Sequence, residues 1–249
     1  LIMIFNFILL KSTNEAPIAI QIIDDKQNKY LIKTPFRISP SKWSEDKQRP
    51  NNIYLKNFKK LHSKLNRIRI AIANYIREIK AKQLTFSLNK VGRIIKKYSS
   101  QNEIAFSEDS LLKYMDAYIT NRLHIISSST YKRYMVFFNL LEKFEGYRMK
   151  NLLLHEVNGT FVSEFLKFGY AEEYCKSTIY RTINFVRTIL NSLEKRGIRT
   201  HVYELELPKD KIKNQIVTLT EDELTIIKRL EVPNRLTAAR DWLVISCYT

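Results

Sequence analysis

The chain has 249 residues, 45% of them hydrophobic, with only 5 Gly and 6 Pro, which predicts an ordered protein rather than a low-complexity one. Its formal net charge of +17 favours a polyanionic partner, with nucleic acid ahead of a membrane surface. Two distant cysteines and four scattered histidines argue against a disulfide framework and a zinc site, and no apolar run approaches the roughly 18 residues of a membrane span. We therefore expect a cytoplasmic protein that uses no cofactor, has no small-molecule substrate and does not bind a membrane.

The first 40 residues predict a small antiparallel sheet. Three segments are rich in Ile, Phe, Leu and Tyr ("IFNFILL", "APIAIQIID" and "KYLIKTPFRI"), and a polar turn at 24–28 separates the last two. The first segment lacks the basic region and cleavage site of a signal peptide, so we interpret it as a buried strand, with Met3 as the expected start. Residues 39–52 then predict a loop or single helical turn anchored by Trp43.

A long helix is expected from about Tyr54 to Gln83, because apolar residues recur there at spacings of three and four. A second helix is expected over 87–100. Residues 1–85 hold 17 basic and 6 acidic side chains, a net of +11. With so few acidic partners on the same helix, its basic face is predicted to contact an anion; these residues are Lys56, Lys59, Lys60, Lys64, Arg67, Arg69, Arg77, Lys80 and Lys82.

Residues 107–208 predict a bundle of about four helices. Serine-rich stretches at 107–110 and 127–130 are expected to cap the first two helices. The second is expected to stop at Gly146, and the third to run from Gly159 until Gly169 ends it. The fourth begins near Ser177 and ends near residues 196–197.

The fourth helix of this bundle carries the clearest candidate for DNA contact. Arg and Asn suit bidentate contact with guanine and adenine edges, and they share one polar sector here; its members are Tyr180, Arg181, Asn184, Arg187, Thr188 and Asn191. Lys132 and Arg133 lie in the first turn of the second helix, where backbone amides also favour phosphate. Double-stranded DNA is therefore the expected partner, and RNA is less favoured because the aromatic residues have core spacing.

Residues 209–249 are nearly neutral, with 7 basic and 6 acidic side chains. A charged linker at 209–215 precedes a capping box formed by Thr220 and Glu223, and a turn at 233–234 leads into a final helix. The apolar run 242–245 needs burial on more than one face, so we expect the domain to continue beyond Thr249. The sequence holds no phosphate-binding glycine loop and no nucleophile motif, and its carboxylate clusters fall at helix starts, so we assign no catalytic or metal-binding residue.

The order of these segments resembles a tyrosine recombinase. It is similar to the integrases of phages and conjugative transposons that carry an N-terminal arm-type DNA-binding domain. The stretches that carry the resemblance are "FNFILLKS", "APIAIQI", "YLIKTPFRISPSKW", "STYKRYMVFFNLLEKF" and "KSTIYRTINFVRTILNSLEKRGI". A final stretch, "LTEDELTIIKRLEV" with "AARDWLVISCYT", is similar to the opening of the catalytic domain of that family.

The resemblance implies an α+β chain with four parts. These are an arm-type domain of sheet and long helix at 3–85, a helical connector at 86–104, an all-α four-helix SAM-like core-binding domain at 105–208, and an incomplete catalytic domain at 209–249. It also implies DNA contacts near the sheet and the following loop, at Arg37, Lys42, Lys47 and Arg49. In the core-binding domain the contacts are Lys132, Arg133, Lys176, Tyr180, Arg181, Asn184 and Arg187.

In this family DNA is cleaved through a 3′-phosphotyrosyl link without a cofactor, and copies associate on DNA. The resemblance places the catalytic residues beyond Thr249, so that catalysis is not expected of residues 1–249. It makes Arg240 a helix-packing or salt-bridging residue. The rival interpretation is a stand-alone, non-catalytic DNA-binding regulator or structural protein.

Overall fold

The computed structural model describes residues 4–11, 14–53, 55–100, 106–208 and 218–248. The expected start at Met3, the helix start at Tyr54, the end of the connector at 101–104 and the linker at 209–215 lie outside these ranges. Residues Leu1–Leu207 form one compact unit and Pro208–Thr249 a second, and each is described by itself. Within the first unit we call residues 4–100 the sheet module and residues 106–207 the helical module.

The sheet module begins with the antiparallel sheet that the sequence predicts, in the order β1 (Ile4–Leu9), β2 (Ala16–Ile23) and β3 (Lys29–Ile38). The polar turn before β3 forms around Asp24, whose Oδ1 accepts the N–H groups of Lys26 and Asn28 at 2.9 and 2.8 Å. Because side chains alternate between the faces of a strand, one face of the sheet buries its large apolar residues. The other face is open on β3, where every second residue is exposed.

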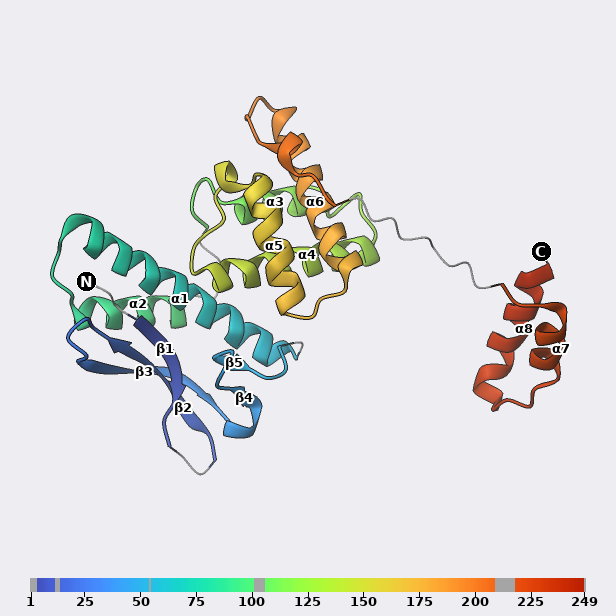
Figure 1. Cartoon of the computed structure of the whole chain (residues 1–249), viewed down its shortest axis with the longest axis horizontal. Helices are drawn as coiled ribbons and strands as arrows, with labels where there is room; N and C mark the ends of the chain where they lie inside the picture. Colours follow the sequence, from blue (N-terminus) through green and yellow to red (C-terminus); the bar gives the residue numbers. More distant parts are fainter. Residues whose placement is uncertain (1–3, 12–13, 54, 101–105, 209–217, 249) are drawn as a thin grey trace. The chain divides into compact units, whose positions relative to one another are not determined.

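Two helices cover the apolar face of the sheet: α1 (Lys56–Lys82) and α2 (Leu88–Ser100) (Figure 1). The shared core joins phenylalanine and isoleucine side chains of β1 and β2 to an apolar stripe on α1 and α2; its members include Phe7, Ile18, Ile20, Ile22, Leu65, Ile68, Ile72, Ile79, Val91 and Ile95. The loop between sheet and helix holds a 3-10 turn (Pro40–Lys42) and a short hairpin of β4 (Trp43–Ser44) and β5 (Arg49–Pro50). Trp43 is buried, as predicted, and the hairpin is an addition to the predicted loop.

The helical module contains α3 (Leu111–Thr120), α4 (Ser128–Arg148), α5 (Gly159–Ala171) and α6 (Lys176–Glu194), with 3-10 turns at Leu154–Glu156 and Val202–Glu204. Ser127 caps α4 as predicted, by accepting the Thr130 N–H. Ser110 occupies the capping position of α3, but its side chain makes no capping bond, so that prediction was wrong. Backbone pairing holds this helix start instead, with the Leu111 N–H donating to the Leu152 carbonyl at 2.9 Å.

Two glycines that the sequence assigns to helix ends lie inside helices. Gly146 does not stop α4, which continues to Arg148 and ends with Met149 in the left-handed conformation at φ 52°. A Cβ at Gly146 would lie 2.4 Å from Cγ of Asn66 on α1, and one at Gly169 would lie 2.5 Å from Cδ1 of Ile179 on α6. Both glycines therefore allow close packing between helices rather than termination.

The second unit contains α7 (Glu221–Arg229) and α8 (Asn234–Tyr248). The predicted capping box is present, since Thr220 and Glu223 exchange hydrogen bonds at the start of α7. Arg240 makes the contacts expected of a packing residue: its Nε donates to Asp241 Oδ1 at 2.9 Å and its Nη1 to the Leu230 carbonyl at 3.0 Å. Trp242 is 70% exposed within the chain.

Candidate nucleic-acid interface

The open face of β3 presents a row of basic side chains. Lys29, Lys33 and Arg37 are all exposed and lie four residues apart, with a register shift in the β2–β3 pairing between the last two. Sequence analysis selected Arg37 but missed Lys29 and Lys33. The signal was present, because "KYLIKTPFRI" places a basic residue at every fourth position of a strand.

The loop residues selected from sequence divide into two groups. Lys42 and Lys47 are exposed, and the Lys42 ammonium lies 5.7 Å from the centre of the Phe58 ring. Lys47 and Arg49 both form ion pairs with Glu172 of the helical module, but the Lys47 side chain is 49% exposed and that of Arg49 only 14%. Arg49 is therefore already engaged inside the protein, and we leave it out of the proposed DNA contacts.

A second basic row follows α6. The apolar stripe of α6 is buried as predicted; its members are Ile179, Ile183, Val186, Leu190 and Leu193. The polar sector of the helix therefore faces outward. Arg181 and Asn184 are exposed and Arg187 is half-buried in this sector. Lys176 and Tyr180 lie one turn apart, with the ammonium 5.4 Å from the centre of the ring. Arg181, Asn184 and Arg187 therefore follow one another at three-residue intervals along one face of α6. This is the spacing of neighbours on a helix surface.

The start of α4 is tied to α6 by aromatic packing. Tyr134 stacks on Phe185 with ring centres 4.3 Å apart, and Phe185 also meets Tyr118 of α3 edge-on. Lys132 and Arg133 are exposed in the turn just before Tyr134. The structure thus places the predicted basic residues of α4 on the helix end that packs against α6.

Part of the basic face of α1 does not contact an anion from outside, which corrects the prediction made for that face. Arg67 forms an ion pair with Glu142 of α4 at 3.4 Å, and Arg77 donates to the Met149 carbonyl at 2.7 Å. Arg69 packs its guanidinium 5.3 Å from the centre of the Phe7 ring. The acidic partner of Arg67 is 75 positions away in the sequence. No helix-local pattern could therefore reveal it.

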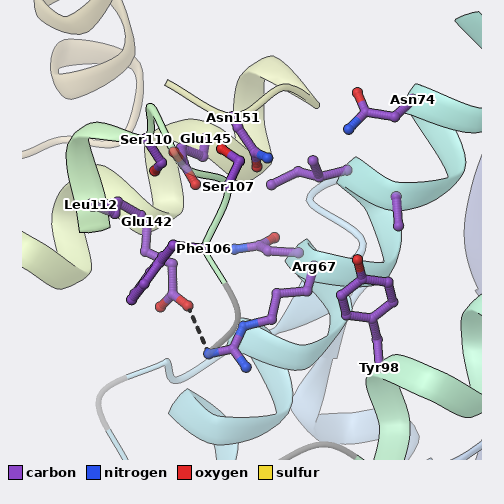
Figure 2. A pocket seen from close by; sticks show the side chains of 13 residues that line it. Arg67, Asn74, Tyr98, Phe106, Ser107, Ser110, Leu112, Glu142, Glu145 and Asn151 are labelled. Carbon is purple, nitrogen blue, oxygen red and sulfur yellow. Dashed lines mark hydrogen bonds and ion pairs between the residues drawn. The ribbon is translucent and has the colours of Figure 1, made fainter. Parts of the chain in front are cut away.

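The Arg67–Glu142 ion pair lines a pocket between α1 and the helical module (Figure 2). Figure 2 shows Arg67 reaching from α1 toward Glu142, with Ser107, Ser110, Glu145 and Asn151 on the opposite side. Glu145 is 5% exposed, and its Oε1 accepts the Leu152 N–H at 2.7 Å. Burial raises the pKa of Glu145 to about 8, so this carboxyl group is largely protonated at neutral pH.

Two family models match the chain. Residues 9–92 match the Arm DNA-binding domain, and residues 110–212 match the Phage integrase SAM-like domain. No curated protein and no solved structure is significantly similar to the chain. Across the part of the chain that the structure describes, no helix has the length and apolar character needed to cross a membrane.

The fold and these matches define a DNA-binding protein of integrase type, with an arm domain followed by a SAM-like helical domain. The two matched domains support an N-terminal region of the kind found in integrases of the tyrosine recombinase family. Both the resemblance and the α+β fold class expected from sequence are confirmed.

Proposed function

We propose that this chain is the DNA-binding portion of a site-specific tyrosine recombinase encoded by a mobile element, and that it binds DNA through two separate surfaces. In this proposal residues 3–85 bind accessory, arm-type sites and residues 105–208 bind the crossover site. Residues 86–104 connect them, and residues 209–249 begin the catalytic domain. The proposed compartment is the cytoplasm, with copies associating on DNA.

The observation that carries the proposal is a row of basic and polar side chains on each of two modules, with the β3 row exposed and Arg181 and Asn184 exposed in the α6 row. The β3 row consists of Lys29, Lys33 and Arg37, and exposed cations on a sheet face suit contact with phosphates. The α6 row consists of Lys176, Tyr180, Arg181, Asn184 and Arg187. A single helix fits the major groove, where Arg and Asn can distinguish guanine and adenine.

Electrostatics supports DNA over a small anionic ligand as the partner of these rows. The net charge of +17 includes a net of +11 in residues 1–85, and the rows lie on open surfaces. A polyanion contacts many such cations at once and releases condensed counterions as it binds. Each row therefore offers several cations that a duplex can contact at the same time.

The experiment is a selection of bound sequences from a pool of random duplexes, followed by affinity measurements across a salt series. We expect two unrelated sequence motifs, one lost when the β3 row is replaced by alanine and the other lost when Arg181 and Arg187 are replaced. Lys167, exposed on α5 and outside both rows, provides the control substitution Lys167→Ala. Recovery of a single motif would favour a stand-alone regulator, and binding that does not weaken with salt would contradict the proposal.

A further inference from the structure

A second cavity lies where the β4–β5 hairpin and α1 meet α4 and the end of α5. Its volume is about 330 Å³, within the range of roughly 300–1,000 Å³ that is common for small-ligand sites. It reaches the surface at Asp46 and Lys47, whose side chains are exposed. We call it the interface pocket; it is distinct from the pocket in Figure 2.

The interface pocket gathers more positive charge than its carboxylates balance. Arg49 of β5, Arg69 of α1 and Lys143 of α4 line it, together with Lys47 at its rim. Glu172 forms ion pairs with Arg49 and, at 3.7 Å, with Lys47. The other lining carboxylate, Asp46, lies exposed at the rim.

Burial and neighbouring positive charge both act on the cations of this pocket. Burial, and then the charge of Arg49, lowers the pKa of Arg69 to about 10 and that of Lys143 to about 8. Lys143 also donates to the Tyr174 hydroxyl at 2.9 Å. Like charges brought together in a partly buried site destabilise the folded chain unless an anion joins them.

Hydrogen-bond donors are also available on the pocket wall. Arg69 has five N–H donors, of which the structure engages one, in a long bond of 3.5 Å to the Gln48 carbonyl. His62 is 5% exposed, and burial lowers its pKa to about 3, so the ring is neutral and keeps one N–H. No residue in the described part of the chain forms a hydrogen bond with this ring.

We propose that the interface pocket binds a phosphate group, held by Arg69, Lys143 and the His62 N–H beside the Arg49–Glu172 ion pair. A phosphate presents several acceptor oxygens and a negative charge, which matches convergent guanidinium, ammonium and imidazole donors. The group comes either from the DNA backbone or from free phosphate or a phosphate ester. The proposal goes beyond DNA binding by the two exposed rows, because it involves none of their residues.

The test is a titration of the full chain with sodium phosphate at pH 7, against sodium chloride of equal ionic strength, followed by calorimetry and by the midpoint of thermal unfolding. We expect saturable binding of one phosphate and a rise in the midpoint that chloride does not reproduce. Lys143→Gln removes one charged donor and should weaken binding by about tenfold or more. Arg69→Gln is the second variant, used if Lys143→Gln fails to fold by circular dichroism, and Lys167→Gln is the matched control.

Absence of saturable phosphate binding by the wild-type chain would overturn the proposal, as would equal weakening by Lys167→Gln. Competition with a 20-base-pair duplex separates the two sources of phosphate: displacement assigns the site to the DNA backbone, and independent binding assigns it to a free phosphate compound. Failure of this site and failure of the proposed function are distinguishable. A chain that binds phosphate but no duplex would refute only the DNA-binding function, and the converse would refute only this site.

Discussion

Basic side chains of β3 and α1 belong to the same module but have different surroundings. On β3, Lys29, Lys33 and Arg37 stand on the open face of a sheet. On α1, Arg67 and Arg77 contact Glu142 and a backbone carbonyl of the helical module. Net charge therefore indicates the kind of partner but does not show which cations remain exposed to it. The comparison predicts that changes to the exposed rows alter DNA binding, whereas changes at the α1–α4 contact alter stability.

The largest effect is expected from removing the whole β3 row. The triple variant Lys29→Ala, Lys33→Ala and Arg37→Ala should make the negative slope of log affinity against log salt less steep by about 2–3. Each lost phosphate contact removes about 0.9 from the magnitude of that slope. Stability should change little, since exposed substitutions usually fall within about 0.5 kcal/mol each. Fluorescence anisotropy across a salt series and thermal unfolding measure the two quantities. An unchanged slope would show that the sheet face does not contact DNA.

At the α1–α4 contact, Gly146→Leu should lower the free energy of unfolding by about 1–3 kcal/mol. The side chain would overlap Asn66, which is buried and packs directly against this glycine. Gly92→Ala in α2 is the matched control, because a Cβ there meets nothing within 4 Å and the helix should gain about 0.5–1 kcal/mol. Urea unfolding measures both. A destabilised Gly92→Ala, or an unaffected Gly146→Leu, would contradict the packing described.

In the α6 row, Arg181→Ala should weaken binding to the selected core sequence by about 1–3 kcal/mol and relax the preference at one base pair. Binding to random duplex should weaken less, because a base contact contributes only where the matching base is present. Competition between selected and random duplexes measures this difference. Equal loss on both duplexes would make Arg181 a phosphate contact instead.

A smaller, pH-dependent effect is expected at Glu145. Burial raises its pKa to about 8 in the folded chain, against an ordinary value of 4.5, so the unfolded chain loses this proton at lower pH. The contribution of Glu145 to the free energy of unfolding should therefore fall as pH rises from about 4.5 to about 8. Glu145→Gln keeps an acceptor for the Leu152 N–H and removes this dependence.

The variant should accordingly be more stable than wild type by about 1–2 kcal/mol at pH 8 and nearly equal to it at pH 5. Urea unfolding at the two pH values checks the sign. A variant that is less stable at both pH values would show that the carboxylate form is favoured in the folded state.

Local signals were sufficient to predict most of the fold. These signals all involve residues that are close in the chain: the alternation of the strands, the three- and four-residue spacing of α1, the Ser127 cap and the Thr220–Glu223 capping box. Gly146 and Gly169 were misassigned because their role is set by Asn66 and Ile179 on other helices, and sequence offers no direct measure of such close approach.

The candidate site, like the fold, was predictable from the sequence only where residues close in the chain determine it. The α6 row follows from helical periodicity around a buried stripe, and its exposure agrees with that pattern. The position of Arg49 was not predictable, because its partner Glu172 is 123 residues away. Only the folded chain separates a cation that faces solvent from one that joins two modules.

The most direct test of DNA binding by the two rows is lysine acetylation of the full chain, read by mass spectrometry with and without bound duplex. Duplex should protect Lys29 and Lys33 on β3 and Lys132 and Lys176 near the α6 row, while Lys113 and Lys167 remain reactive. Protection confined to Lys113 and Lys167, or equal reactivity at all six lysines when the duplex is bound, would contradict the assignment of these rows as the DNA-binding surfaces.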